Sequence, residues 1–429
     1  MKDKILKILR HESFIYLISN IIYSFSTYLV VLSVPYILDK ISMAHFSSAL
    51  NVIMLMIFIF EFGLTVSFLR FRQLYAISDV INALFQTFIY LIMILFAYTF
   101  LGNLIEPILH IKDIDVDTHL IYFSAMALLS WVFLKSYFLA KSDIKAIFQN
   151  AIAILIFRII LLVYIFHYKI KSLEEIILYL FVIPFLYVFF RNFTENLRNI
   201  SVLLDIIKRK IKLSFFGYRV KKYITYSLLS YIIGALFIYT SRYLILYLTD
   251  KKEYSILAEL GYAMSFLGLI LIFVTSIRTY FISKFNISDI ENISNYVKKI
   301  KSYAIYYFPF AFVFSFLVAL VVEIIKPSYL THQSSIFVFI LIFANMLISY
   351  YSLFTLLSKT FNYNMLELKL NIVRLILVVL SVRLFFDYNP IAGFALINFW
   401  IVFVEFVFAK IVLSRVKRKE IAYAAAKTN

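Results

Sequence analysis

The sequence contains no cysteine and few glycines or charged residues. Without cysteine no disulfide can form, and the redox compartment cannot be read from the sequence. Charged residues make up 15% of the chain, whereas soluble domains carry about 25%. Only seven glycines are present, and the phosphate-cradling pattern GxxxxGK[ST] is absent. The composition therefore excludes an ordinary soluble domain, and the missing motif excludes a nucleotide-driven motor within these residues.

Metal-binding and catalytic patterns are also missing. The six histidines are scattered and form no HExxH motif. The segment KDIDVDTH alternates carboxylates from Asp113 to Asp117, which also occurs in Asp-x-Asp metal sites of glycosyltransferases. It lacks the glycine and terminal glutamate of a calcium loop, and a solvated acidic loop is the favoured interpretation. We therefore predict no metal site and no catalytic residue.

Apolar residues dominate what is present: 63% of the chain is hydrophobic, and the mean hydropathy is +0.91. Apolar runs of the length that crosses a bilayer recur throughout, and the period-two alternation of membrane barrels is absent. We predict an all-α, polytopic membrane protein of about twelve transmembrane helices. The predicted spans are 14–38, 45–69, 82–102, 119–140, 146–167, 173–190, 223–248, 254–277, 303–325, 334–357, 366–386 and 390–412. Pro184 and Pro309 lie inside two of these spans, where a proline predicts a kink.

The net charge of +18 has a topological explanation. With the N-terminus inside, 31 of the 42 lysines and arginines fall in cytoplasmic segments or at the cytoplasmic ends of spans, eight in outer loops or at outer span ends, and three deeper within spans. This bias follows the positive-inside rule, so a nucleic-acid partner is not needed to explain the charge. We predict a multi-pass protein with both termini in the cytoplasm.

The longest polar interruption, 191–222, divides the spans into two groups of six. We predict an N-terminal six-helix bundle over 1–190, a basic cytoplasmic linker over 191–222, and a C-terminal six-helix bundle over 223–429. Within the linker, NLRNISVLLDIIKRKIKL has the pattern of an amphipathic helix on the inner leaflet. A simple tether between the two bundles explains the same residues equally well.

Three stretches resemble a transporter family. PYILDKISMAHFSSALNVIMLM leads into EFGLTVSFLR, SYFLAKSDIKAIFQN spans 136–150, and SRYLILYLTDKKEYSILAEL spans 241–260. Together they resemble Wzx-type O-antigen and capsular polysaccharide flippases, of the polysaccharide transporter family in the MOP exporter superfamily. The chain departs from that pattern at Ser47 and Ser255, where the family often has glycine, and at Ser241, where an aspartate often precedes the arginine.

The resemblance implies a MATE-like or MurJ-like MOP fold and a function in polysaccharide biosynthesis. The substrate would be an undecaprenyl-diphosphate-linked oligosaccharide repeat unit, moved across the bacterial inner membrane by alternating access. Implied partners are membrane lipids and, for O-antigen, lipopolysaccharide or capsule assembly, polymerase and chain-length regulator proteins. The implied energy source is an H⁺ or Na⁺ gradient, with no other cofactor.

Arginines within the spans are the candidate headgroup ligands. A charge at the bilayer centre costs roughly 2.5–3.5 kcal/mol on insertion scales, and Arg158 lies near the middle of its predicted span. Guanidinium groups bind phosphate oxygens bidentately. We predict that Arg158, Arg242 and Arg374 bind the diphosphate at staggered depths. Alternatively, each neutralises a structural glutamate or reaches the interface.

Glutamates within the spans are the candidate coupling groups. Glu61, Glu259 and Glu405 lie inside predicted helices, and a desolvated carboxyl exchanges a proton more easily near neutral pH. Each therefore either couples transport to an ion or forms an ion pair with a cavity arginine. For Glu61 a third interpretation is local hydrogen bonding at a helix end, beside a closely packed Gly63.

Two other functions remain open at this stage. One is an O-antigen polymerase or membrane glycosyltransferase, although the longest outer loop, 102–118, is short for an active site. The other is a MATE-like drug exporter with a small cationic substrate, which arginines in the cavity would repel. The predicted chain is thus a transporter rather than an enzyme.

Overall fold

The computed structural model describes residues 12–61, 111–141, 143–197, 229–267, 290–360 and 364–428. All regular structure within these ranges is helical, which confirms the predicted all-α class. Nine helices of the described part are long and apolar enough to cross a membrane. The predicted span 82–102 lies outside the described residues, as do parts of its neighbours, and twelve spans remain compatible with the structure.

The chain forms two compact units. Unit 1 comprises 1–235 with 245–257, and unit 2 comprises 236–244 with 258–429. Helices α12 (Leu229–Asp250) and α13 (Tyr254–Ser265) thus contribute residues to both units. The predicted bundle boundaries stay a prediction, because most of the linker 191–222 lies outside the described residues.

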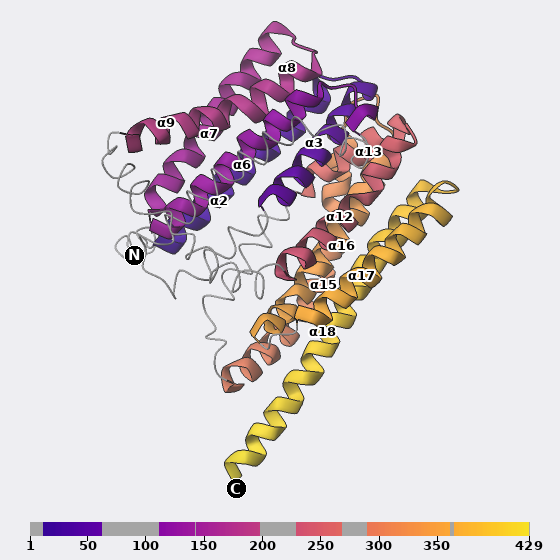
Figure 1. Ribbon diagram of the computed structural model, residues 1–429. Helices are drawn as coiled ribbons and strands as arrows, with labels where there is room; N and C mark the ends of the chain where they lie inside the picture. Colours follow the sequence, from indigo (N-terminus) through magenta and orange to yellow (C-terminus); the bar gives the residue numbers. More distant parts are fainter. Residues whose placement is uncertain are drawn as a thin grey trace. The chain divides into compact units, whose positions relative to one another are not determined.

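The described part of unit 1 consists mostly of long helices that pack side by side (Figure 1). Helix α2 packs on α7, α3 packs on α6, and α9 packs on both α6 and α7. The elements are α2 (Glu12–Ser33), η1 (Val34–Tyr36), α3 (Lys40–Glu61), η3 (Ile111–Asp113), α6 (Thr118–Lys141), α7 (Ile144–Tyr168), α8 (Leu173–Ile177), η4 (Leu178–Val182) and α9 (Ile183–Leu197).

Local sequence explains where these helices begin and end. Asp143 caps α7, since its carboxylate accepts the Ala146 N–H at 3.0 Å. Helix α7 ends at Lys169, which takes a left-handed conformation with φ 52°. Asp39 accepts the Ser42 N–H at 2.8 Å at the start of α3. This hydrogen bond holds the pKa of the Asp39 carboxyl below its usual value.

Unit 2 is built around α16, which packs against both α15 and α18 (Figure 1). Helix α17 precedes α18 in the chain and packs on it. The elements are α15 (Ile290–Ile325), α16 (His332–Thr360), α17 (Asn364–Ser381), η6 (Val382–Phe386) and α18 (Pro390–Thr428).

Two helices of unit 2 are longer than a membrane is thick. Helix α15 has 36 residues and α18 has 39, which at ~1.5 Å per residue exceeds the roughly 30 Å hydrocarbon core. A buried cluster ties α15, α16 and α18 together. It consists of Ile293, Tyr296, Ile300, Tyr350, Leu353, Phe354, Phe408, Ala409, Val412 and Val416. The Tyr296 hydroxyl donates to the Leu353 carbonyl at 2.9 Å, so even the polar atom of this ring is satisfied.

Long apolar side chains remain exposed on one face of several helices. A soluble protein does not leave contiguous rows of this kind in water, whereas lipid tails cover them at no cost. The rows therefore mark lipid-facing surfaces of a multi-pass membrane protein. They include Ile156, Ile159, Ile160, Val163 and Phe166 on α7, Phe312, Val313, Phe316, Leu317 and Leu320 on α15, and Ile372, Val373, Ile376 and Leu380 on α17.

Gly393 provides a test of the packing between η6 and α18. A Cβ at this position would lie 2.7 Å from the Phe386 Cα, which is a backbone atom that cannot rotate away. We expect Gly393→Ala to lower the free energy of unfolding by about 1–3 kcal/mol, the usual range for overpacking, measured by thermal unfolding in detergent. Gly234→Ala is the matched control, because its Cβ would meet only the tip of the Phe58 ring at 3.0 Å. Equal unfolding temperatures for the two variants would contradict the proposed clash.

Candidate functional site

Arg158 lies at the centre of unit 1 with 0% of its surface exposed. Its guanidinium reaches from α7 to α2, where Nη1 donates to the Ser26 Oγ at 2.9 Å and to the Thr27 Oγ1 at 2.8 Å. The guanidinium also lies over the rings of Phe181 and Phe185, whose centroids are 5.5 and 4.9 Å from Cζ. Hydroxyls and aromatic faces therefore replace the water that this cation loses.

A proline explains the remaining bond of Arg158. Its Nε donates to the Leu180 carbonyl at 3.1 Å. In an α-helix the N–H of residue 184 would bond this carbonyl, but Pro184 has no N–H. Leu180 lies in η4, a π-helical segment in which the Ile183 N–H bonds the Leu178 carbonyl instead. The sequence predicted a kink at Pro184; the structure shows a carbonyl left available to a buried cation.

The charge of Arg158 meets only neutral groups. No carboxylate of the described residues lies within ion-pair distance of it, and its Nη2 is buried without a hydrogen-bond partner among them. Because a buried cation with an unused donor retains the capacity to bind an anion, its chemistry suits a phosphate oxygen. In this conformation the side chain is enclosed by protein, and the diphosphate-binding role stays a prediction.

Arg374 is compensated in a different way. It is 3% exposed, and its Nη2 forms an ion pair with the Glu405 Oε2 at 2.7 Å. The Nη1 donates to the Asn371 Oδ1 at 2.9 Å, while the other oxygen of Glu405 accepts the Thr355 hydroxyl at 3.0 Å. The ring centroid of Phe237 lies 5.0 Å from the Arg374 Cζ. The structure thus brings together two predicted site residues as a buried ion pair.

Glu259 has no cationic partner among the described residues. It lies in α13 with 1% of its surface exposed, and its Oε1 accepts the backbone N–H of Thr331 at 2.8 Å. Its Oε2 is buried and makes no hydrogen bond to the described residues. A buried carboxyl with one idle oxygen is costly as an anion unless a proton or cation reaches it, which suits the predicted coupling role.

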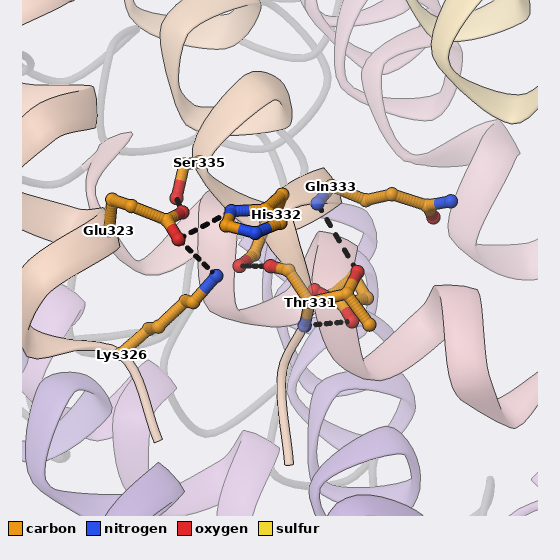
Figure 2. A network of polar contacts seen from close by, with 8 residues as sticks. Glu323, Lys326, Thr331, His332, Gln333 and Ser335 are labelled. Atoms are coloured by element: carbon orange, nitrogen blue, oxygen red, sulfur yellow. Dashed lines mark hydrogen bonds and ion pairs between the residues drawn. The ribbon is translucent and has the colours of Figure 1, made fainter. Parts of the chain in front are cut away.

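A second carboxylate beside Thr331 organises the turn between α15 and α16 (Figure 2). The Glu323 carboxylate forms an ion pair of 2.7 Å with the Lys326 ammonium and a second contact with the His332 imidazole, and it accepts a hydrogen bond from the Ser335 hydroxyl. His332 and Ser335 follow the turn after α15, so no helical spacing rule predicts their contact with Glu323. The network holds the start of α16 against the end of α15.

The other predicted site residues are less informative. Arg242 lies half-buried in α12, within unit 2. Glu61 is the last residue of α3, and its side chain lies outside the described residues. Among the described residues, no group of three or more histidines and acidic side chains is placed to hold a metal ion.

The turn between α12 and α13 fastens onto α3 within unit 1. Ser48 and Thr249 share a buried hydroxyl hydrogen bond of 2.8 Å, and the rings of His45 and Tyr254 lie 4.7 Å apart. The His45 Nδ1 accepts the Asp115 N–H at 3.0 Å, so the acidic loop packs onto α3 as well. Sequence reasoning missed this contact because its members are distant in the chain.

Comparison with known proteins identifies the fold. No protein-family model matches the chain, and no curated protein matches it. Among solved structures it is similar to the lipid II flippase MurJ in an inward closed conformation, with 15% identity, a TM-score of 0.63, and coverage of 95% of this chain and 87% of that one.

Two MATE transporters show weaker likeness. VcmN of Vibrio cholerae in the bent form has 14% identity, a TM-score of 0.44 and coverage of 98% and 99%; ClbM in complex with Rb⁺ has 12% identity, a TM-score of 0.39 and coverage of 95% and 93%. The likeness to MurJ shows that the chain has a MOP fold, as predicted. At 15% identity it shows the fold and not the substrate.

The Arg374–Glu405 pair can be tested by a double-mutant cycle. The single variant Glu405→Leu leaves a buried guanidinium without its counter-charge, and the single variant Arg374→Met leaves a buried carboxylate; for each we expect a loss of about 3–5 kcal/mol in unfolding free energy. The double variant Arg374→Met with Glu405→Leu removes both charges and should recover most of that loss. Denaturant unfolding in detergent measures all members of the cycle. If the losses simply add, the two side chains do not depend on one another.

Pro184 can be tested through Arg158. Pro184→Ala supplies an N–H that competes for the Leu180 carbonyl, and we expect a loss of about 1 kcal/mol in stability together with faster exchange of the Arg158 Nε proton. Nitrogen-15 NMR of labelled arginine follows that proton. Pro309→Ala, in the interior of α15, is the control and should leave the signal unchanged. A slow Nε proton in Pro184→Ala would show that proline is not what frees the carbonyl.

Proposed function

We propose that the chain is a lipid flippase that moves an undecaprenyl-diphosphate-linked oligosaccharide repeat unit, of O-antigen or capsule, across the bacterial inner membrane. The proposal joins the MOP fold shared with MurJ to the sequence resemblance to Wzx-type flippases. MurJ is a flippase of a lipid, lipid II, and the substrate proposed for this chain is likewise carried on a lipid. Both termini of the chain would face the cytoplasm.

One observation supports the anionic substrate most directly: among the described residues, Arg158 is surrounded by neutral groups and its Nη2 has no hydrogen-bond partner. An exporter of small cations would gain nothing from such a group, since it repels cations in a low dielectric. A polymerase needs an active site instead, for which the described residues offer no catalytic constellation. Arg242 and Arg374 are assigned to the same headgroup path, with Arg374 released from Glu405 when substrate is present.

Alternating access requires contacts that close one side and then separate. Within unit 1, the Ser48–Thr249 bond and the Lys252–Asp113 ion pair of 3.8 Å join the α12–α13 turn to α3 and to the acidic loop. We assign these contacts to the outer side, because the loop carries few lysines and arginines. Opening toward the outside would break them.

We assign the coupling of transport to an ion gradient to the glutamates within the spans. Glu405 already has a permanent cation in Arg374, whereas the Glu259 Oε2 accepts no hydrogen bond from the part of the chain that the structure describes. Glu259 is therefore the stronger candidate to bind H⁺ or Na⁺, with Glu61 as a second. Polymerase and chain-length regulator proteins would act on the product on the outer side.

Export in a deletion strain tests the proposal. Loss of the protein should stop polymer export and leave un-flipped lipid-linked repeat units on the inner face, detected by their protection from externally added glycosidase. Arg158→Ala should lower export at least about 100-fold while the protein stays in the membrane at normal level, because a charge-assisted contact to phosphate is lost. The export rate of Arg158→Lys should lie between that of the wild type and that of Arg158→Ala. Normal export by Arg158→Ala would contradict the assigned role.

A further inference from the structure

A polar stripe runs along the face of α2 that packs inside unit 1. Tyr16, Asn20, Tyr23 and Thr27 follow one another at spacings of four, three and four residues, so they lie on one side of the helix. Tyr23 packs against Trp131 of α6 and Phe185 of α9, with centroid distances of 5.5 and 6.3 Å. The stripe therefore faces protein rather than lipid.

A lysine that the charge count assigned to the cytoplasm meets this stripe. Lys135 lies inside a candidate span of α6, and its Nζ donates to the Asn20 Oδ1 at 2.6 Å. The same Nζ lies over the Tyr16 ring, 5.6 Å from the centroid. No carboxylate of the described residues forms an ion pair with it. An ammonium has three donors, and the Asn20 amide occupies one of them.

Lys135 and Arg158 thus share an arrangement. Each is a cation held by neutral oxygens of α2, at Asn20 and at Ser26 with Thr27. The two contact points are about 10 Å apart along the helix at ~1.5 Å per residue. Lys135 is partly accessible, whereas Arg158 is 0% exposed. Of the two cations, Lys135 is therefore the more accessible to an anion.

We propose that Lys135 and Asn20 form an anion-binding subsite for phosphate groups, from which a headgroup passes along the α2 stripe to Arg158. The inference rests on the proposed function and adds a residue that the sequence did not single out. The residue type at position 20 matters, because an aspartate there would pair with the Lys135 ammonium and cancel its charge. The Asn20 amide orients the ammonium and leaves its charge available.

One substitution at Asn20 separates anion binding by Lys135 from the packing of α2 against α6. Asn20→Asp keeps an oxygen that accepts from Lys135 and adds a negative charge beside it. If Lys135 only braces α2 against α6, the stronger ion pair leaves binding unchanged and holds the helices together at least as well. If Lys135 binds anions, the new carboxylate competes with them.

The experiment uses the full chain in nanodiscs, with inorganic pyrophosphate and undecaprenyl diphosphate as separate probes in a calorimetric titration. We expect Asn20→Asp and Lys135→Gln each to weaken binding of the lipid probe at least about ten-fold, the effect of losing one charge-assisted hydrogen bond. Lys135→Arg should retain binding. Asn345→Asp, a change of the same kind in α16 of unit 2, is the control and should bind like the wild type.

The titrations with the two probes distinguish the possible roles of Lys135. Weakened binding of both probes supports a subsite for phosphate in general, and weakened binding of the lipid probe alone supports a headgroup subsite that needs the lipid chain. Unchanged binding in Asn20→Asp overturns the subsite while leaving the proposed function standing, even where Lys135→Gln fails to fold. A wild-type chain that binds neither probe overturns both proposals.

Discussion

The desolvation of guanidinium groups is the physical constraint on which the organisation of both units depends. Removing such a cation from water is costly, and protein must supply what water gave. In unit 1, Arg158 receives two hydroxyls, a helix carbonyl and two aromatic faces. This set solvates the charge without cancelling it, and it draws α2, α7 and the π-helical segment together around one side chain.

Unit 2 meets the same constraint with an ion pair. Arg374 and Glu405 neutralise one another, Asn371 accepts from the Arg374 Nη1 and Thr355 donates to the Glu405 Oε1, while the Arg374 Nε has no hydrogen-bond partner among the described residues. Such a pair can hold α16, α17 and α18 in register, and it has little attraction left for an ion from outside while it remains closed. The units therefore differ in electrostatic character among the described residues: in unit 1 the Arg158 cation meets neutral groups, whereas in unit 2 the Arg374 cation meets the Glu405 carboxylate.

An interruption of the regular helical hydrogen bonds positions the Arg158 side chain. Pro184 withholds an N–H, the helix widens to a π-turn, and the carbonyl of Leu180 becomes an acceptor for a side chain. Functional features in membrane helices often occur where the regular hydrogen-bond ladder is interrupted, since only there does the backbone offer unused polar groups at membrane depth. A proline read from sequence as a bend thus serves as a means of binding a cation.

The all-α membrane class, most span positions and the presence of Arg158, Arg374, Glu259 and Glu405 within spans follow from the sequence alone, because hydropathy and the cost of charge in lipid act on each segment separately; the burial of these side chains in protein is a finding of the structure. Only the tertiary structure decided which charges meet. Arg374 and Glu405 are 31 residues apart, Lys135 and Asn20 are 115 apart, and nothing in local spacing relates them. Which charged side chains meet depends on how the helices pack, and in this fold the packing contacts join segments that are distant in the sequence.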